Sequence, residues 1–421
     1  MLYGVVNWVY LAVSVVFAIL AANAYFPVRR EPLTVVSFAL GWIPSELPVQ
    51  MAVIEIAGTI VFAWEGALKS WPGWFGAAVV VATCGAWAGL AAVAHRSKVL
   101  VDQALLEATG GAVSVDGLDP VPAWNRWWRL AIAVPFRFRG IKRVKNIDYW
   151  GDGNYRHKLD ILSRRFVVAD KAPVLVYIHG GAWITGDKRQ QGIPLMHELA
   201  QRGWVCVAIN YRLSPRAIWP AHIVDCKRAV AWVRQHIGEY GGDPNFIAVS
   251  GGSAGGHLSS LLALTPNDAT WQPGFEDLDT SVDACVPFYG VYDTTGDPEL
   301  SGAYGTGTVD LLERLVMKTT SSDNPVLFEQ ASPDHRVTPE APPMFVFHGV
   351  NDTLVPLAVG RHFVAQLRSI SAAPVAYVEL PRAQHAFDVM ASIRSRHTTM
   401  GAVQFLEGMR LRVRRGPSSQ N

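Results

Sequence analysis

The sequence predicts an α/β fold, a mostly parallel eight-stranded sheet with helices on both faces, preceded by an α-helical transmembrane region. Two observations support this prediction. From about residue 146 short strand-like runs alternate with helical stretches, which is the pattern of a parallel sheet covered by helices. Residues 1–94 contain only seven charged side chains and consist mainly of long apolar runs, which is the pattern of membrane helices.

Length, charge and cysteine content narrow the class of protein. The chain has 421 residues, enough for one large domain and an accessory region. Its formal net charge is +2, so no overall field favours a polyanionic partner. The four cysteines fall in apolar or helical runs without metal-site spacing. We therefore expect small buried thiols, with no disulfide framework and no cysteine metal site.

Three apolar segments are candidate membrane spans within residues 1–98. Segments 1–28 and 70–94 contain no charged side chain, and each exceeds the ~20 residues that a helix needs to cross a bilayer. Segment 47–64 contains Glu55 and is the weaker third candidate. An acid inside a span is a candidate for a specific role, although it can also face a neighbouring helix.

Two further features of this region have alternative interpretations. Segment 33–42 is apolar but short, and Pro44 follows it, so we expect an interfacial or re-entrant piece. The tripeptide Ala-Asn-Ala at 22–24 resembles a signal-peptide cleavage site. Cleavage is the less favoured alternative, because the basic start of a signal peptide is missing and more membrane-type sequence follows.

Residues 99–145 are expected to connect the spans to the α/β domain. Segment 121–145 mixes tryptophan and phenylalanine with arginine and lysine and contains no acid. Beside transmembrane helices, this composition favours a segment that lies among lipid headgroups. Nucleic-acid binding is disfavoured, because no nucleic-acid-binding fold accompanies the basic segment.

The α/β domain is expected at 146–415, followed by a disordered tail at 416–421. The predicted strands are 146–150, 157–161, 174–178, 205–210, 246–249, 284–288, 344–347 and 376–380. The predicted helices are 194–202, 223–236, a stretch directly after residue 253, 359–370 and 398–411.

Residues 251–255 read Gly-Gly-Ser-Ala-Gly between a predicted strand and a predicted helix. The pattern G-x-S-x-G in this context is a tight turn that exposes a nucleophilic serine. Glycines are needed because side chains there would clash with the neighbouring strand and helix. Ser253 is therefore the candidate nucleophile. The alternative is a glycine-rich turn that happens to contain a serine.

A serine hydroxyl is a weak nucleophile until a base removes its proton, and histidine can accept and return a proton near neutral pH. His385 follows the last predicted strand, whereas its competitor His397 lies in a helical stretch. Asp352 also follows a strand and would hold the tautomer of the imidazole, unless it only closes a turn. Asp323 and Asp334 are less well placed for this role.

Residues 179–183 read His-Gly-Gly-Ala-Trp directly after a predicted strand. A tetrahedral intermediate carries an oxyanion, which backbone N–H groups stabilise if small residues let them approach it. We expect an oxyanion hole formed by Gly180, Gly181 and Ala182 together with Ala254. The expected donors are the N–H groups of Gly181, Ala182 and Ala254. A simple glycine turn at a strand end is the alternative.

The chain order serine, aspartate, histidine is typical of α/β-hydrolases. With the segment Asn-Tyr-Arg-Leu-Ser-Pro at 210–215, these motifs resemble the bacterial branch of the hormone-sensitive-lipase-like esterases over about residues 149–408. The resemblance implies a serine carboxylesterase or lipase with the triad Ser253, Asp352 and His385. It also implies short- to medium-chain acyl esters as substrates and no cofactor.

Two positions depart from the pattern of that family. Gly252 stands where the family usually has an acid, and Ala182 stands where the oxyanion loop usually has a third glycine. Neither change removes a catalytic group, because the oxyanion donors are backbone N–H groups. The multi-span amino terminus resembles a membrane-anchored subgroup of bacterial lipases and esterases.

The sequence thus predicts a membrane-anchored ester hydrolase acting on a small-molecule or lipid acyl ester. An amidase, deacetylase or peptidase with the same triad is the alternative, and a non-catalytic binding module of the same fold is a more distant one. We expect the substrate to reach the site from the membrane side, with segments 121–145 and 296–333 as candidate caps.

The distribution of basic residues predicts the orientation in the membrane. Arg29 and Arg30 follow the first span, and His95, Arg96 and Lys98 follow the third. With three spans both basic flanks lie on one side, which favours a cytoplasmic α/β domain and an external amino terminus. With two spans, or after cleavage, a domain exposed in the cell envelope is the alternative.

Overall fold

The computed structural model describes residues 2–111, 140–165 and 171–415. Most of the aromatic and basic segment predicted at 121–145, and the tail predicted at 416–421, lie outside the described residues.

The centre of the molecule is an eight-stranded sheet with the order β1-β2-β4-β3-β5-β6-β7-β8. Strand β2 is antiparallel to both β1 and β4, and the other neighbours are parallel. The predicted fold class is therefore confirmed. The strands are β1 (Ile141–Asp148), β2 (Lys158–Arg164), β3 (Ala172–Ile178), β4 (Val205–Ile209), β5 (Gly242–Gly252), β6 (Ala284–Phe288), β7 (Met344–Gly349) and β8 (Val375–Leu380).

Helices cover both faces of the sheet, and two hydrophobic clusters lie between them and the strands. One cluster joins the sheet to α7, α8 and α12, and the other joins it to α6, α13 and the second half of α4. The central strands β3, β4 and β6 are buried along their whole length, as expected for parallel strands covered on both sides. The helices of this domain are α6 (Ile193–Gln201), α7 (Ala221–His236), α8 (Ala254–Leu264), α9 (Pro298–Ser301), α10 (Thr306–Leu311), α11 (Pro325–Ala331), α12 (Leu357–Ile370) and α13 (Ile393–Arg415).

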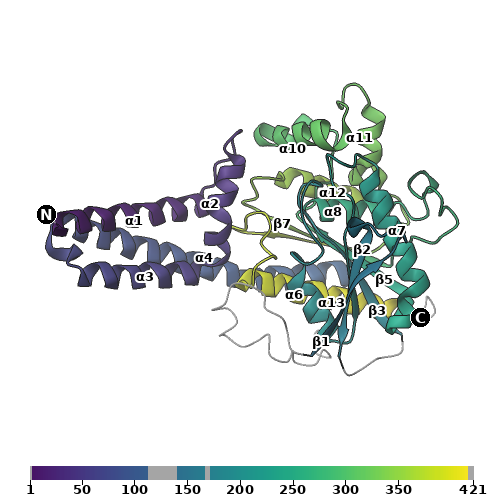
Figure 1. The fold of residues 1–421 in the computed structure, drawn as a ribbon, viewed down its shortest axis with the longest axis horizontal. Helices are drawn as coiled ribbons and strands as arrows, with labels where there is room; N and C mark the ends of the chain where they lie inside the picture. The colour runs from purple at the N-terminus through teal and green to yellow at the C-terminus, as the bar shows by residue number, and fades with distance from the viewer. Residues whose placement is uncertain (1, 112–139, 166–170, 416–421) are drawn as a thin grey trace.

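The first four helices project from this domain as a rod, with the amino terminus at its far end (Figure 1). They are α1 (Leu2–Tyr25), α2 (Thr34–Glu46), α3 (Pro48–Trp64) and α4 (Trp71–Thr109). Helices α1, α3 and α4 pack together along the rod, while α2 lies at its junction with the sheet (Figure 1). By length and composition, two described helices could cross a membrane, or up to three if α2 and α3, bent by 88° at their junction, form one broken span.

Helix α4 belongs to both parts of the molecule. Its first half packs against α1 and α3, and its second half packs against α13 and β8. Val101, Ala104 and Leu105 of this second half are buried in the core of the α/β domain. The predicted connector therefore differs from the structure at both ends, because residues 99–109 continue α4 and β1 begins at Ile141. Local periodicity could not reveal that residues 99–109 pack in the core of the domain, since the helix buries them against a distant part of the chain.

Glu55 faces a neighbouring helix rather than the outside of the rod. Its side chain is buried, and it accepts hydrogen bonds from the Thr83 hydroxyl and, over 2.9 Å, from the Trp87 indole of α4. An acid inside an apolar helix is costly unless its oxygens are paired. These two donors account for Glu55 as a contact between α3 and α4.

Candidate active site

Ser253 lies between the end of β5 and the start of α8. Its φ of 57° and ψ of −123° are rare for a residue with a side chain, and they mark a strained turn. The turn is tight because a Cβ at Gly255 would lie 2.1 Å from the Ile178 carbonyl oxygen. A Cβ at Gly251 would lie 2.4 Å from the Gly255 carbonyl oxygen. The glycines thus let the strand and helix approach closely around the serine.

Asp352 and His385 follow β7 and β8, two neighbouring parallel strands, so their loops lie at the same edge of the sheet. The Nδ1 atom of His385 lies 2.7 Å from Oδ2 of Asp352. Both side chains are buried. The hydrogen bond places the proton on Nδ1 when the ring is neutral, and it leaves Nε2 as the acceptor.

The carboxylate of Asp352 is held in its charged form. Burial raises the pKa of this carboxyl. The interaction with His385 and the hydrogen bonds together lower it by a larger amount, so the net pKa is below the usual value. Oδ1 accepts hydrogen bonds from the N–H groups of Leu354 and Val355 over 2.8 and 2.9 Å. A charged, fixed carboxylate can orient His385 and stabilise its imidazolium form.

The predicted oxyanion loop follows β3 and faces the serine turn. A Cβ at Gly180 would lie 2.5 Å from the Gly252 carbonyl oxygen, so only glycine fits there. The N–H group of Gly180 donates to Oε1 of Gln191 over 2.7 Å and is therefore occupied. Within the described chain, the N–H groups of Gly181, Ala182 and Ala254 have no hydrogen-bond acceptor.

Ala182 has a φ of 53°, a conformation that favours glycine. This position is the one at which the resembling family usually has glycine, and the backbone conformation explains that preference. Alanine adopts it at a modest energetic cost.

The His179 side chain packs against the start of the oxyanion loop. Burial lowers its pKa to about 4, so the ring is neutral at physiological pH. Nδ1 lies 2.8 Å from the Gly180 carbonyl oxygen, and the ring stacks on Tyr211, with ring centroids 4.5 Å apart. Tyr211 in turn donates its hydroxyl to the His179 carbonyl oxygen over 2.9 Å. This aromatic pair fixes the start of the loop.

A pocket of about 460 Å³ contains the candidate residues. Ser253, His385, Gly181 and Ala182 all line it, whereas Asp352 lies behind His385. The remaining lining residues are Phe38, Trp42, Ile184, Thr185, Gln191, Tyr289, Leu354, Ala386 and Val389. The pocket is thus largely apolar, with the serine and histidine exposed to it.

Helix α2 forms a wall of this pocket, a role that the sequence did not indicate. The Trp42 indole donates to the Ala386 carbonyl oxygen over 2.9 Å, and the Phe38 ring lies 6.0 Å from the His385 ring. The end of α1 and the start of α2 also contact the Asp352 loop. Asn351 donates to the Ala24 carbonyl oxygen over 2.9 Å, and Thr353 donates to that of Thr34 over 3.0 Å.

Of the two segments predicted as caps, the structure describes the second along its whole length and the first only at its end. Of the segment predicted at 121–145, residues 121–139 lie outside the described residues, and β1 begins at Ile141. Segment 296–333 folds as α9, α10, a π-helix (Leu312–Met317) and α11. Its Thr308 hydroxyl donates to the carbonyl oxygen of Leu354, a residue of the pocket, over 3.1 Å. For the residues of α2, the sequence predicts an interfacial or re-entrant piece and gives no sign that they form a wall of the pocket.

Two more residues near His385 had no sequence signal. Gln384 accepts hydrogen bonds through Oε1 from the N–H groups of His385 and Thr353 over 2.9 and 2.8 Å. Tyr289 packs its ring 4.5 Å from that of His385 and hydrogen-bonds to the buried Asp388. A Cβ at Gly252 would lie 2.7 Å from the Tyr289 hydroxyl, which leaves no room for an acid before the serine.

Among the described residues, one group of acidic and histidine side chains has ligand atoms close enough to hold a metal ion. It consists of Asp293, Asp334 and His335. Burial and the neighbouring Asp293 raise the pKa of Asp334 to about 8. None of the three lines the Ser253 pocket.

The sheet topology and the strand–serine–helix turn define the class: the protein is an α/β-hydrolase. Solved esterases share this fold. Esterase B from Lactobacillus rhamnosis matches with a TM-score of 0.58 at 18% identity, covering 76% of this chain and 99% of that one. A thermophilic esterase of Thermogutta terrifontis, solved with butyrate, matches with a TM-score of 0.52 at 25% identity, covering 67% and 97%.

Sequence relatives define the family more narrowly. The BD-FAE family model matches residues 159–367. The probable carboxylic ester hydrolase LipM of Mycobacterium tuberculosis is 43% identical over 412 residues, which cover 94% of this chain and 92% of LipM. Esterase LipC of the same organism is 40% identical over 320 residues, covering 76% and 78%. The chain therefore belongs to the hormone-sensitive-lipase-like carboxylesterases.

Proposed function

We propose that this protein is a membrane-anchored serine carboxylesterase that hydrolyses acyl esters through an acyl-enzyme. The observation that carries the proposal is the 2.7 Å contact between His385 and Asp352 in loops that face the pocket containing Ser253. A base that is oriented by a buried carboxylate and lines the same pocket as a serine on a strained turn is the arrangement that activates a serine nucleophile.

In the proposed reaction, Ser253 Oγ attacks the carbonyl carbon of the ester while Nε2 of His385 takes its proton. The N–H groups of Gly181, Ala182 and Ala254, which have no acceptor within the described chain, stabilise the resulting oxyanion. The C–O bond to the alcohol then breaks, and His385 gives its proton to the leaving oxygen. Water attacks the acyl-enzyme with His385 again as base, which releases the acid and restores the serine.

The test of this proposal is a serine substitution in the full chain. Ser253→Ala should lower p-nitrophenyl butyrate turnover by at least a thousandfold and abolish labelling by a fluorophosphonate. Ser369→Ala is the control, because Ser369 is exposed on α12 and should leave both readouts unchanged. Full activity or labelling in Ser253→Ala would overturn the proposal.

We further propose that α1, α3 and α4 each cross the membrane and that the residues from 141 to 415 form the catalytic domain on the cytoplasmic side. The basic residues Arg29, Arg30, Arg96 and Lys98 all lie toward the catalytic end of the rod, whereas Lys69 lies at the far end. An excess of basic residues marks the cytoplasmic end of membrane helices.

A further inference from the structure

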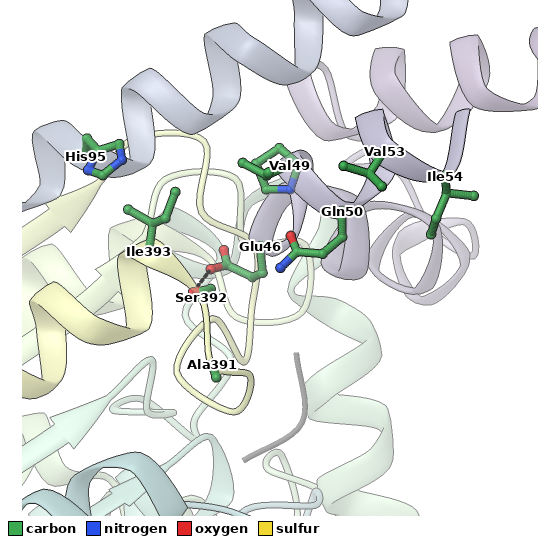
Figure 2. Close-up of a pocket in the computed structure, with 10 residues that line it drawn as sticks. Glu46, Val49, Gln50, Val53, Ile54, His95, Ala391, Ser392 and Ile393 are labelled. Carbon is green, nitrogen blue, oxygen red and sulfur yellow. Dashed lines mark hydrogen bonds between the residues drawn. The ribbon is translucent and has the colours of Figure 1, made fainter. Parts of the chain in front are cut away.

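A second pocket lies at the junction between the helical rod and the catalytic domain. Its volume is about 610 Å³. Figure 2 shows its walls, which come from the end of α2, the start of α3, one residue of α4, and the segment before α13 together with the first residue of that helix. The lining residues are Glu46, Pro48, Val49, Gln50, Val53, Ile54, His95, Ala391, Ser392 and Ile393. We call it the junction pocket.

One wall of the junction pocket belongs to the outer surface of the helical rod. Val49, Val53 and Ile54 of α3 line the pocket, yet 51%, 60% and 57% of their surfaces are exposed. Exposed apolar side chains on a helix of this composition are suited to lipid rather than to water. The pocket is therefore continuous with the surface that a bilayer would cover.

The sequence of α4 indicates at what depth in a bilayer the junction pocket would lie. Residues 71–94 of this helix carry no charge, and His95, which lines the pocket, is followed by Arg96 and Lys98. Such a change from apolar to basic side chains marks the boundary between hydrocarbon and headgroups. Ester groups of bilayer lipids lie at this boundary, with their acyl chains on the hydrocarbon side. The junction pocket opens at the same level.

The one carboxylate in the wall of the junction pocket already has a cationic partner. Glu46 accepts a hydrogen bond from the Ser392 hydroxyl over 2.8 Å and forms an ion pair with Arg394, and both charged side chains are buried. A paired carboxylate needs no cationic ligand. The pair also ties the end of α2 to the start of α13, so that it holds the pocket wall in place.

The junction pocket and the Ser253 pocket share two structural elements. Trp42 and Glu46 lie four residues apart on one side of α2, and the first lines the Ser253 pocket while the second lines the junction pocket. In the segment after His385, Val389 lines the Ser253 pocket and Ala391 lines the junction pocket. The two pockets are therefore neighbours along both elements.

We propose that the junction pocket binds an acyl chain of a lipid ester that resides in the bilayer, while the ester group of the same molecule reaches Ser253. This proposal rests on the ester-hydrolase function and specifies its substrate class as long-chain, membrane-embedded esters. The chain leaves the bilayer sideways along Val49 and Val53. A water-soluble short-chain ester would use the Ser253 pocket without filling the junction pocket.

The first test fills the junction pocket with a larger side chain. In liposomes, Val53→Trp should lower the ratio of kcat/KM for a palmitoyl ester to kcat/KM for p-nitrophenyl butyrate by at least tenfold. Ile60→Trp is the matched control, because Ile60 is 62% exposed on the same helix and does not line the pocket. Its ratio should stay within twofold of the wild-type value.

An unchanged ratio for Val53→Trp, or an equal loss on both substrates, would overturn the proposal. These outcomes differ from failure of the catalytic assignment, which would appear as activity on both esters in Ser253→Ala.

The second test locates the acyl chain directly and does not depend on a filled pocket. Ser253→Ala protein in liposomes is mixed with a long-chain ester that carries a diazirine at the end of its acyl chain, and is then irradiated. We expect adducts on peptides that contain Val49 or Val53 and on those that contain Ile393. Excess unlabelled palmitoyl ester should compete with these adducts, whereas excess phospholipid without the ester should not. Adducts confined to other membrane-facing residues such as Ile60, or competition by phospholipid alone, would overturn the proposal.

Discussion

At the scale of single residues, Gln384 connects the two loops of the candidate active site. Its buried Oε1 accepts hydrogen bonds from the N–H groups of His385 and Thr353, which belong to the loops after β8 and β7. It thereby fixes the distance between His385 and Asp352 without contacting a substrate pocket. Gln384 is a positioning residue in the proposed mechanism.

Gln384→Ala should leave two N–H groups without an acceptor, which costs about 1–3 kcal/mol for each buried group. We expect a lower melting temperature and a loss of about tenfold or more in kcat, with KM for butyrate esters nearly unchanged. Gln384→Glu keeps an acceptor oxygen and should restore most of kcat. A variant Gln384→Ala with the kcat of wild type, or no rescue by Gln384→Glu, would contradict this role.

Asp388, which hydrogen-bonds to Tyr289, makes stability depend on pH. Burial raises its pKa from 3.8 to about 6. Because the folded-state pKa lies above the unfolded-state value, the protonated form favours folding. That contribution is fully present below pH 3.8 and is lost as the pH rises through about 6. Above that pH the buried charge remains as a constant cost.

Asp388→Asn should remove this cost and keep an acceptor for Tyr289. Its gain in free energy of unfolding over the wild type should therefore grow by about 1.4 kcal/mol between pH 5 and pH 8, since one pKa unit corresponds to that energy. Denaturant unfolding in detergent at the two pH values measures this difference. A gain that is equal at both values, or larger at pH 5, would be inconsistent with a raised pKa.

At the scale of secondary-structure elements, the packing of α1 against α4 connects the helical rod to the candidate active site. A Cβ at Gly89 of α4 would lie 2.5 Å from the Tyr25 hydroxyl, which itself donates to the Ala86 carbonyl oxygen over 2.8 Å. The end of α1 contacts the Asp352 loop, because the Ala24 carbonyl oxygen accepts from Asn351. A shift of α1 therefore reaches the loop that orients His385.

Gly89→Leu should push α1 away from α4, lower the melting temperature in detergent by several degrees and reduce butyrate hydrolysis several-fold. Gly85→Leu is the matched control one turn earlier on α4, because nothing lies within 4 Å of a Cβ at Gly85. That variant should keep both the stability and the activity of the wild type. If the two variants behaved alike, the close contact of α1 with α4 would not matter for the active site.

At the scale of the whole molecule, a single helix joins the helical rod to the catalytic domain. Helix α4 has 39 residues, and at about 1.5 Å per residue it is about 58 Å long. Its second half is part of the core of the domain, so the domain cannot rotate freely on a flexible linker. In the proposed membrane topology, this packing would hold the active site at a fixed height and orientation relative to the bilayer.

The proposed orientation predicts the outcome of protease treatment. In spheroplasts, a carboxy-terminal tag should be protected until detergent is added, because the catalytic domain is cytoplasmic. A tag at the amino terminus should be digested from outside, because three crossings place it on the opposite side. Digestion of the carboxy-terminal tag in intact spheroplasts would show that the catalytic domain faces the cell envelope instead.

Much of the fold could be predicted because its signals are local. Each of the eight predicted strands overlaps an observed strand, since buried parallel strands appear as short apolar runs between helices. The turn around Ser253 could be recognised because its glycines and the serine lie within five consecutive residues, 251–255. The loops of Asp352 and His385 could be placed at one edge of the sheet because each follows a strand.

The contacts around these residues depend on parts of the chain that are far apart in the sequence. The contacts of Asn351 with Ala24 and of Trp42 with Ala386 join residues that are 327 and 344 apart in the sequence. No local periodicity encodes such pairs, because the same apolar pattern fits a helix in lipid and a helix over a pocket. The sequence alone determined the hydrolase sheet and the candidate triad. Tertiary packing places α2 as a wall of the Ser253 pocket and continues α4 from the helical rod into the core of the domain.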